Sequence, residues 1–246
     1  MKLLVDIGNT NTSIAILHNK KIVKQYFLHT SRKNISTAAF KRLLRTYIEK
    51  IDQVFIVSVV PKFLVITEKV LRGIFSGKDI FVAGRDIKVP IANKYQKPSA
   101  VGQDRLVTAY AAFSKYGCPV LIIDFGTAVT FDLVNKKGEY EGGLIFPGTR
   151  LGLSALTQNA ALLPKTSLKP ERGLIGRNTR GSINKGILYG YAALCDGMID
   201  KFKSRYGRSL KVVATGGDAA LVKKYSTEIG RIDPDLLFAG LSLMLT

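Results

Sequence analysis

A repeated turn motif limits the folds open to this chain of 246 residues more than any other feature. The first copy reads Asp6-x-Gly8-x-x-x-Thr12, and the second reads Asp124-x-Gly126-x-x-x-Thr130. Each copy ends a short apolar run, and an apolar run that stops at Asp-x-Gly predicts a buried strand followed by a tight turn. The matching spacing, found with a matching order of elements, predicts a duplicated α/β unit with a cleft between its copies.

The hydrophobic pattern predicts the other elements of each copy. Apolar runs predict strands at residues 2–7, 13–17, 22–28, 54–60 and 80–83, and again at 120–124, 129–134 and 210–214. Apolar residues at helical spacing predict helices at residues 35–51, 63–73, 99–115 and 186–205. Both halves then follow the order strand, glycine turn, strand, strand, helix, strand. We therefore expect two domains, residues 1–117 and 118–246.

The composition is typical of a packed soluble protein, with 46% hydrophobic and 22% charged residues. Only two cysteines occur, Cys118 and Cys195, which fits a reducing compartment, and we expect both to be small buried side chains. The first apolar run stops at Asp6, too early for a signal-peptide core, and no apolar stretch is long enough to span a membrane. We therefore expect a cytoplasmic protein.

The chain is strongly basic, with 37 Lys and Arg against 18 Asp and Glu and a net charge of +19. Such a balance is compatible with an anionic partner such as nucleic acid. The basic residues are spread along the chain, however, and form no tract of five or six. ATP and a carboxylate substrate are attracted by the same field, so the charge leaves a nucleic-acid partner open without favouring it.

The first turn carries residue types that hold phosphate. Gly8 has no Cβ, so backbone N–H groups are able to approach a phosphate closely. Asn9, Thr10 and Thr12 add polar side chains, while Asp6 offers the oxygen ligands that Mg²⁺ prefers. The alternative is a hairpin turn whose side chains bind only local backbone. Two copies of the turn favour phosphate binding over that alternative.

The second turn offers the same chemistry. Thr127 is placed to bind a phosphate oxygen, and Asp124 to hold a metal or a monovalent cation. Thr130 and Asp132 are two residues apart in a strand, so we expect them to share one face. The glycines of Thr215–Gly217 follow another buried strand and either receive an adenine or ribose or simply form a turn.

The segment from Pro98 to Arg105 joins the two halves. Ser99 is a good N-cap, which predicts that Asp104 and Arg105 lie in the first turns of a helix. Asp104 then has two possible roles. It either stabilises the helix through the helix dipole, or it orients a substrate hydroxyl proton while Arg105 contacts an anionic substrate or phosphate. Spacing alone does not decide between these roles.

Other catalytic motifs are missing from the sequence. No serine-hydrolase elbow and no P-loop occurs, which argues against an α/β-hydrolase and a P-loop enzyme. The two histidines, His18 and His29, both fall in the first predicted hairpins and indicate neither a zinc cluster nor a histidine acid–base pair. Phosphate chemistry at the glycine turns remains the leading interpretation.

Six motifs occur in order between residues 2 and 217. They are Asp6–Thr12, Ser58–Pro61, Gly102–Arg105, Asp124–Asp132, Gly142–Gly148 and Thr215–Gly217. Each is loose by itself, but the ordered set closely resembles the type III pantothenate kinase family of the acetate kinase, sugar kinase, chaperone and actin superfamily. The resemblance implies a duplicated ribonuclease H-like (actin-like ATPase) fold and a homodimer. It also implies phosphorylation of pantothenate by ATP with Mg²⁺ and K⁺ or NH₄⁺, the first step toward coenzyme A.

The resemblance also implies roles for individual residues. It assigns ATP phosphates to Thr127 and to the turn formed by Asp6, Ile7, Gly8, Asn9, Thr10, Asn11, Thr12 and Ser13, with Mg²⁺ held through water at Asp6. It assigns pantothenate to Tyr95, Gly102, Gln103, Asp104, Arg105 and Thr179. Asp104 becomes the proton acceptor, with Arg105 beside it, and Asp124 holds the monovalent cation.

The sequence departs from the family pattern at Gln103, where the family usually has Ala. Because Gly102, Asp104 and Arg105 are present, we expect altered local packing and retained chemistry. Two rival functions remain. One is a kinase of the same superfamily that acts on another hydroxylated acid or sugar, and the other is a regulatory nucleic-acid-binding protein that keeps the fold without activity. The motif at Gly102–Arg105 and Tyr95 argue against the first rival, and no helix-turn-helix supports the second.

Overall fold

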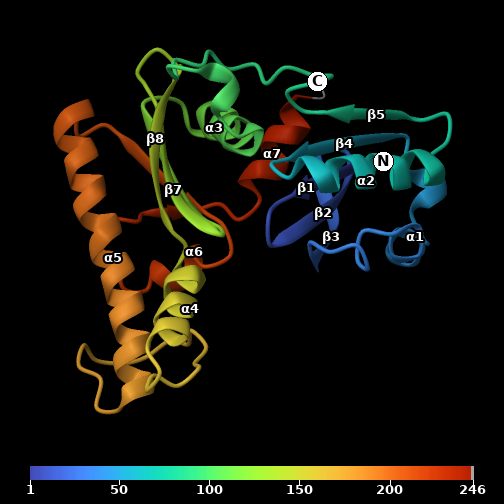
Figure 1. The fold of residues 1–246 in the computed structure, drawn as a ribbon. Coiled ribbons are helices and arrows are strands. Elements are labelled where there is room, and N and C mark those ends of the chain that lie inside the picture. The colour runs from blue at the N-terminus through green and yellow to red at the C-terminus, as the bar shows by residue number, and fades with distance from the viewer. Residues whose placement is uncertain (245–246) are drawn as a thin grey trace. The chain divides into compact units, whose positions relative to one another are not determined.

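The computed structural model describes residues 1–244, which belong to two compact units. The N-terminal unit contains residues 1–91 and 96–111, together with residues 237–244. The C-terminal unit contains residues 92–95 and 112–236. Each unit has one five-stranded sheet with helices beside it (Figure 1).

The N-terminal sheet has the strand order β3-β2-β1-β4-β5. Its strands are β1 (Lys2–Ile7), β2 (Asn11–His18), β3 (Lys21–His29), β4 (Gln53–Ser58) and β5 (Asp79–Val82). The first three strands pair antiparallel, whereas β1 with β4 and β4 with β5 pair parallel. The predicted strand at 54–60 is confirmed as a central one, because Val54 through Val57 are all buried.

The C-terminal sheet repeats this plan. Its strands are β6 (Val120–Phe125), β7 (Ala128–Val134), β8 (Tyr140–Pro147), β9 (Lys211–Thr215) and β10 (Arg231–Ile232). Their order is β8-β7-β6-β9-β10, with β6, β7 and β8 antiparallel and β9 parallel to both β6 and β10. Because strand order and strand direction both match the first sheet, the predicted duplicated α/β fold is confirmed.

The helices of the N-terminal unit differ from the prediction in two places. The single helix expected at 35–51 is wrong: α1 (Thr37–Leu44) ends early, and the 3₁₀ turn η1 (Ile48–Lys50) follows it. Thr46 and Tyr47, which lie between them, are β-branched and aromatic, which disfavours a continuous helix. Ser36 caps α1 by accepting a hydrogen bond from the Ala39 N–H, at 3.3 Å.

The second difference is the start of the helix that carries Asp104. Ser99 lies within the 3₁₀ turn η2 (Pro98–Ala100) and makes no side-chain cap, so the predicted N-cap is wrong. The helix α3 (Gln103–Tyr116) begins four residues later. The Gly102 carbonyl accepts the hydrogen bond from the Leu106 N–H, at 3.3 Å, so the backbone of Gly102 starts the helix.

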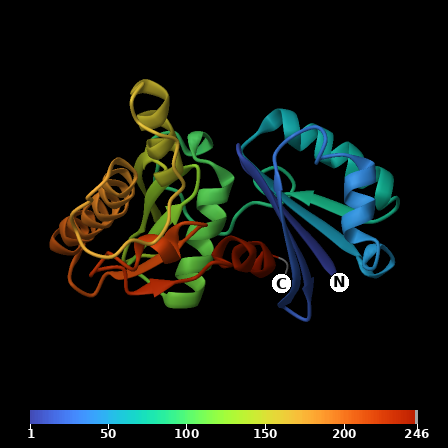
Figure 2. The same ribbon diagram turned by 90° about the horizontal axis from the view of Figure 1, so that it is seen from below.

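The core of the N-terminal unit lies between its sheet and two helices. Alternate residues of β1, Leu3, Val5 and Ile7, are fully buried and belong to one cluster with Phe40 of α1 and Leu71 of α2 (Pro61–Ile74). Figure 2 shows α1 and α2 along the same face of this sheet. The helix α7 (Leu236–Leu243) packs tightly against α3, since a Cβ on Gly240 would lie 2.3 Å from the Val107 carbonyl oxygen.

The C-terminal unit contains the longest helix, α5 (Thr179–Tyr206), with α4 (Thr149–Asn159) and the short α6 (Ala219–Val222). The helix α5 begins seven residues before the prediction because Asn178 caps it, accepting a hydrogen bond from the Gly181 N–H at 2.9 Å. Burial raises the pKa of the Cys195 thiol to about 12, which confirms Cys195 as a buried hydrophobic side chain. Cys118 is only half-buried, so the same prediction is wrong there.

No helix within residues 1–244 is long and apolar enough to cross a membrane.

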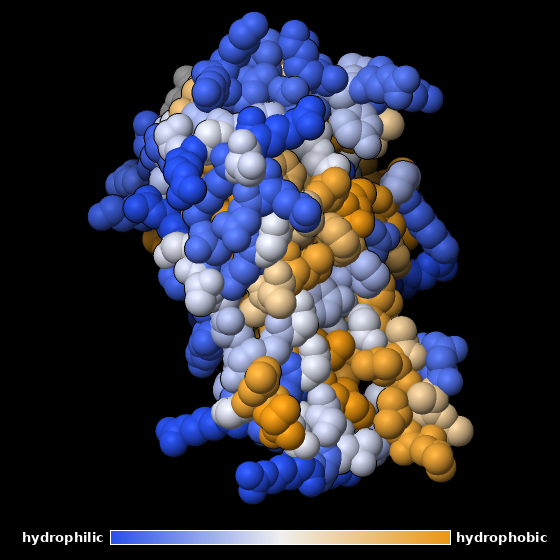
Figure 3. Space-filling view, turned by 90° about the vertical axis from the view of Figure 1, so that its left-hand side faces the viewer, coloured by the Kyte–Doolittle hydropathy of each residue, from blue (hydrophilic) through white to orange (hydrophobic). Residues whose placement is uncertain are grey.

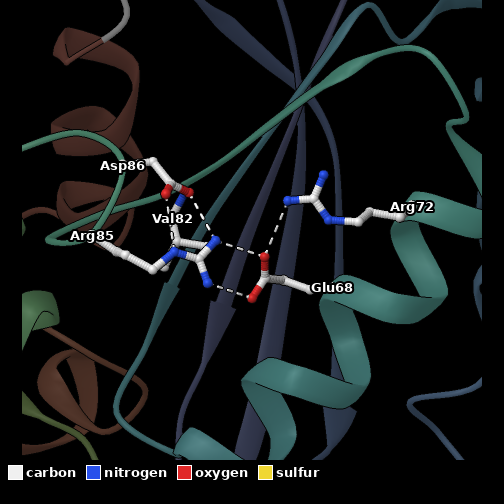
Figure 4. A network of polar contacts seen from close by, with 5 residues as sticks. All are labelled: Glu68, Arg72, Val82, Arg85 and Asp86. Carbon is white, nitrogen blue, oxygen red and sulfur yellow. Dashed lines mark hydrogen bonds and ion pairs between the residues drawn. The ribbon is translucent and has the colours of Figure 1, made fainter.

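A charged cluster fixes the turn that follows β5 (Figure 4). The guanidinium of Arg85 donates two hydrogen bonds to the Glu68 carboxylate of α2, at 2.7 and 2.8 Å, and two more to Asp86. Asp86 also accepts a hydrogen bond from the Val82 N–H, at 2.9 Å. We call Glu68, Arg85 and Asp86 the Glu68 clamp. Its hydrogen bonds from Arg85 lower the pKa of the Glu68 carboxyl, and Arg85 likewise lowers the pKa of Asp86.

The clamp predicts an acid-dependent stability. A carboxyl whose pKa is lowered by folding stabilises the folded state above its unfolded pKa, and this contribution disappears as the pH falls through the lowered pKa. Glu68→Gln should therefore lower Tm at pH 7 by about 2 °C, the effect of about 0.5–1 kcal/mol. The difference from the parent should shrink below about pH 4.3, the ordinary pKa of Glu.

The matched control is Glu49→Gln, which neutralises an exposed Glu in the same unit. When Tm is measured by calorimetry across pH 3–7, the profile of Tm against pH for this control should run parallel to that of the parent. A Glu68→Gln profile parallel to that of Glu49→Gln would mean that the clamp contributes nothing to stability.

Candidate functional site

The first glycine turn is a tight hairpin between β1 and β2. The Gly8 N–H donates to the Asn11 carbonyl, at 3.0 Å, and a Cβ on Gly8 would lie 3.0 Å from the same oxygen. Asn9, Thr10 and Asn11 are exposed at the tip, while Asp6 and Ser13 pair across the two strands. The turn thus presents polar side chains on a tightly closed hairpin backbone.

The hydroxyl of Thr12 is used inside the unit. Thr12 is fully buried, and its Oγ1 lies 3.0 Å from the Oγ1 of Thr30. Thr30 in turn donates from its hydroxyl to the Gly8 carbonyl, at 2.8 Å, and from its N–H to the Thr10 carbonyl, at 2.8 Å. The end of β3 therefore braces the glycine turn. Sequence reasoning missed Thr30, because only the pairing of β2 with β3 brings it there.

The N-terminal unit brings the Gly8 turn and the start of α3 to the same sheet edge. The strands β1 and β4 are parallel, so Ile7 and Ser58 end side by side. The next residue, Val59, donates its N–H to the Ile7 carbonyl, at 3.2 Å. A Cβ on Gly102 would lie 3.3 Å from Val59 Cγ1, so the residue before α3 packs directly on this edge.

Asp104 occupies the space that Gly102 leaves open. A Cβ on Gly102 would lie 2.5 Å from Asp104 Oδ1, closer than any real contact. The same oxygen accepts a hydrogen bond from the Arg105 N–H, at 2.8 Å, so the carboxylate folds back toward the first turn of α3. Asp104 and Arg105 are both half-buried. A glycine at position 102 is therefore a requirement of the Asp104 conformation.

The second glycine turn joins β6 to β7 in the C-terminal unit. The Gly126 N–H donates to the Ala128 carbonyl, at 3.1 Å, and leaves Thr127 exposed. The Gly148 N–H donates to the Thr127 carbonyl, at 3.1 Å, where a Cβ on Gly148 would lie 2.3 Å from that oxygen. The residue before α4 is thus a glycine because the Thr127 turn leaves no room for a side chain.

Asp124 stands at the end of β6 beside a third glycine. Gly216 follows β9, which is parallel to β6, and has a φ of +89°. A Cβ there would lie 2.5 Å from Asp124 Oδ1 and 2.7 Å from the Phe125 backbone. Gly216 therefore leaves the space that the Asp124 carboxylate occupies. Of the glycine pair after β9, for which sequence left two interpretations, Gly216 has this packing role and Gly217 does not.

Asp218 ties the loop after β9 to the start of α4. Thr149 Oγ1 donates to Asp218 Oδ2, at 2.5 Å, and the Arg150 guanidinium donates to both carboxylate oxygens, at 2.8–3.2 Å. Asp218 is buried, whereas the Arg150 side chain is largely exposed. These hydrogen bonds link the loop that carries Gly216 to the start of α4, which follows Gly148. Sequence reasoning missed them, because their partners lie 68 and 69 residues apart.

A buried polar group supports the segment that carries Tyr95. Thr130 Oγ1 donates to Asp132 Oδ2, at 2.8 Å, which confirms that these two side chains share a face. The hydroxyl of the fully buried Tyr140 donates to Asp132 Oδ1, at 2.7 Å. The Tyr140 backbone exchanges hydrogen bonds with Ala92 and Lys94, each at 2.8 Å, so residues 92–94 add to the edge of β8.

Tyr95 follows that paired segment directly. Its ring lies against Gly142 of β8, where a Cβ would be 3.4 Å from Tyr95 Cδ2. Its N–H donates to the side chain of Asn93, at 3.0 Å. Thr179, the remaining predicted substrate residue, is the exposed first residue of α5. The C-terminal unit therefore carries Tyr95, Asp124, Thr127 and Thr179, and the N-terminal unit carries the other predicted site residues.

The acidic residues fit a cation that is mostly ligated by other oxygens. Within residues 1–244, no group of three or more His, Cys, Asp or Glu side chains is placed to hold a metal ion. Asp6 and Asp124 each end a central strand beside a glycine turn, and the space at Asp124 is one that a Cβ would fill. Their carboxylates suit hard cations whose other ligands come from water or phosphate.

The fold and these turns define the class of protein: duplicated α/β units of the actin-like ATPase and sugar kinase architecture. Comparison with protein families identifies the family within this class. The model of type III pantothenate kinase matches residues 2–201, and the chain belongs to that family.

The relatives match along nearly the whole chain. The type III pantothenate kinase of Geotalea uraniireducens is 37% identical over 99% of this chain and 97% of its own length. The protein of that name from Myxococcus xanthus is 37% identical with the same coverage. The one from Persephonella marina is 38% identical over 91% of this chain and 90% of its own length.

Solved structures share the fold at low sequence identity. A conserved Baf family protein from Campylobacter jejuni superposes with a TM-score of 0.61 and 18% identity, covering 99% of this chain and 96% of its own. Component A of the (R)-2-hydroxyglutaryl-CoA dehydratase of Acidaminococcus fermentans gives 0.53 and 16%, covering 98% and 94%. These likenesses establish the architecture alone.

The tight space at Asp124 yields a stability prediction. Gly216→Ala places a Cβ 2.5 Å from the Asp124 carboxylate at a positive φ, so it should lower the free energy of unfolding by about 1–3 kcal/mol. Gly217→Ala is the control, because its Cβ would meet no atom within 4 Å, and it should stay within about 0.5 kcal/mol. Urea unfolding measures both. Equal values for the two variants would contradict the packing role of Gly216.

Proposed function

We propose that this protein transfers the γ-phosphoryl group of ATP to the primary hydroxyl of pantothenate, giving 4'-phosphopantothenate in the first step of coenzyme A synthesis. One observation carries the proposal. The family match covers residues 2–201 and includes both glycine turns together with Gly102–Arg105, the motif to which the resemblance assigns pantothenate.

In this proposal the N-terminal unit binds ATP phosphates at the turn from Asp6 to Ser13. The segment comprises Asp6, Ile7, Gly8, Asn9, Thr10, Asn11, Thr12 and Ser13. Its exposed tip supports direct contact at Asn9, Thr10 and Asn11, whereas Thr12 acts through its buried contact with Thr30. A hairpin braced in this way is preorganised, so little conformational entropy is lost when phosphate binds.

The C-terminal unit contributes Thr127, which is exposed and binds a phosphate oxygen of ATP in the proposal. It also contributes Tyr95 and Thr179 to pantothenate. The support for Tyr95 is its position, since the paired segment and Gly142 hold its ring. Gly102, Gln103, Asp104 and Arg105 of the N-terminal unit bind the same substrate.

Two cations complete the proposal. Asp6 holds Mg²⁺ through water, and Asp124 holds K⁺ or NH₄⁺. Such cations offset the negative charge of the phosphates and leave the proton chemistry to the protein.

Asp104 is the proposed proton acceptor, and Arg105 neutralises charge near the transferred group. Phosphoryl transfer depends mainly on alignment and charge stabilisation. The Asp104 carboxylate is held at the start of α3 by the Arg105 N–H and by the space at Gly102, which fixes one of its oxygens. The carboxylate accepts the hydroxyl proton of pantothenate while the hydroxyl oxygen bonds to the γ-phosphorus and the bond from that phosphorus to the ADP oxygen breaks, releasing ADP.

We further propose a cytoplasmic homodimer. Its support is a set of exposed apolar side chains on β8, α4 and the segment after α4: Ile145, Leu151, Leu156, Leu162, Leu174 and Ile175. Figure 3, which views the molecule from the left-hand side of Figure 1, shows exposed apolar side chains in its lower part. Large groups of exposed apolar side chains are typical of protein–protein interfaces.

The direct test is ADP release with ATP, Mg²⁺ and pantothenate, with and without K⁺ or NH₄⁺. We expect turnover that requires pantothenate and rises severalfold with the monovalent cation. Pantoate, a hydroxylated acid that lacks the β-alanine part, and glucose serve as alternative acceptors. Turnover with glucose but not with pantothenate would replace this proposal by a sugar kinase.

The proposed role of Asp104 predicts a specific kinetic pattern. Asp104→Asn keeps an oxygen for the Arg105 N–H but loses the proton acceptor, so kcat should fall about 10²–10⁴-fold. The KM for ATP should change less than about threefold, because the phosphates are bound elsewhere. Steady-state kinetics with both substrates varied measures these effects. An unchanged kcat would remove Asp104 from the chemistry.

A further inference from the structure

Gln103 is packed against a glycine in the turn after β5. A Cβ built on Gly84 would lie 2.3 Å from Gln103 Cδ, 2.5 Å from its Oε1 and 2.6 Å from its Cγ. The Gln103 side chain therefore occupies the space that any other residue at position 84 would fill. Gly84 has a φ of +83°, which favours glycine, and any Cβ at this position would displace the end of the Gln103 side chain.

The turn that carries Gly84 is held by backbone hydrogen bonds. The Gly84 N–H donates to the Ile87 carbonyl, at 2.8 Å, and the Arg85 and Asp86 N–H groups donate to the Val82 carbonyl, at 3.2 and 2.9 Å. Ala83 donates its N–H to the Ile56 carbonyl of β4, at 2.8 Å. Gln103 therefore meets a turn that is anchored to the sheet.

The Glu68 clamp holds the same turn from the side of α2. Arg85 and Asp86 follow Gly84 directly, and the guanidinium of Arg85 bridges Asp86 and Glu68 (Figure 4). The Glu68 side chain is only 13% exposed. A bidentate pair with a nearly buried carboxylate has a defined geometry, unlike a mobile surface pair. The turn is thus fixed at two ends, by β4 and by α2.

We propose that Gln103 and Gly84 form a positioning contact that sets the first turn of α3, and with it the Asp104 carboxylate, against the anchored turn after β5. Gln103 is the first residue of α3 and precedes Asp104 directly. Gly102 packs on Val59, so residues 102 and 103 contact the chain that follows β4 and the turn that follows β5. The kinetic consequence of this contact rests on the proposed role of Asp104.

A double-mutant cycle tests the contact. Gly84→Ala should push the Gln103 side chain away and lower kcat at least tenfold, since a misplacement of about 1 Å in a catalytic group is able to cost 10²-fold. Gln103→Ala removes the contact without a clash and should lower kcat about threefold. The double variant Gly84→Ala/Gln103→Ala should recover to within about threefold of Gln103→Ala. The KM for ATP should stay within twofold throughout.

Gly77→Ala controls for backbone strain. Gly77 also has a positive φ, +76°, and its Cβ would meet nothing within 4 Å, so this variant carries the strain without the clash. Its kcat should remain within twofold of the parent. The inference is overturned if Gly84→Ala behaves like Gly77→Ala, or if the double variant is no better than Gly84→Ala.

Hydrogen exchange separates this inference from the proposed function. Amides in the first turns of α3 should exchange about tenfold faster in Gly84→Ala and return toward the parent rate in the double variant. That pattern supports the contact even if Asp104→Asn proves fully active and the proposed chemistry fails. Unchanged exchange in Gly84→Ala would overturn the contact while leaving pantothenate-dependent turnover intact.

Discussion

The candidate site depends on carboxylates that lie where a neighbouring residue has no side chain. In the N-terminal unit, a Cβ on Gly102 would lie 2.5 Å from Asp104 Oδ1. In the C-terminal unit, a Cβ on Gly216 would lie 2.5 Å from Asp124 Oδ1. Each carboxylate is therefore confined by backbone, which moves less than a side chain does. A side chain at either glycine would therefore force the carboxylate beside it to move.

Much of the fold was predictable because it depends on short-range patterns. Apolar runs that end in Asp-x-Gly identified the central strands β1 and β6, and the matching element order identified the duplication. The same reasoning failed at Ser99, a favourable N-cap residue that lies inside a 3₁₀ turn after Pro98. Local propensity suggests where a helix is able to begin, whereas packing of Gly102 on Val59 determines where it does begin.

The supporting residues of the site were beyond prediction for a different reason. Thr30 reaches the Gly8 turn across 22 residues, and Asp218 reaches Thr149 across 69. Tyr140 is a fully buried aromatic residue whose hydroxyl role appears only once β7 and β8 are paired. Their residue types are common, and no spacing rule relates them to their partners. The sequence therefore offered candidates for the residues that carry chemistry, whereas the residues that brace those candidates became visible only in the structure.

The duplication also explains how two similar turns come to have different surroundings. The residue after β4 is Val59, whose side chain packs against Gly102 and helps to hold the start of α3. Gly216 follows β9, and its lack of a side chain leaves space for the Asp124 carboxylate; by strand register it corresponds to Ser58, the last residue of β4. The chain after β4 and the chain after β9 therefore support Asp104 and Asp124 in different ways. Asp6 and Asp124 thus occupy equivalent strand ends in different surroundings, and the different cations proposed for them rest on the family resemblance.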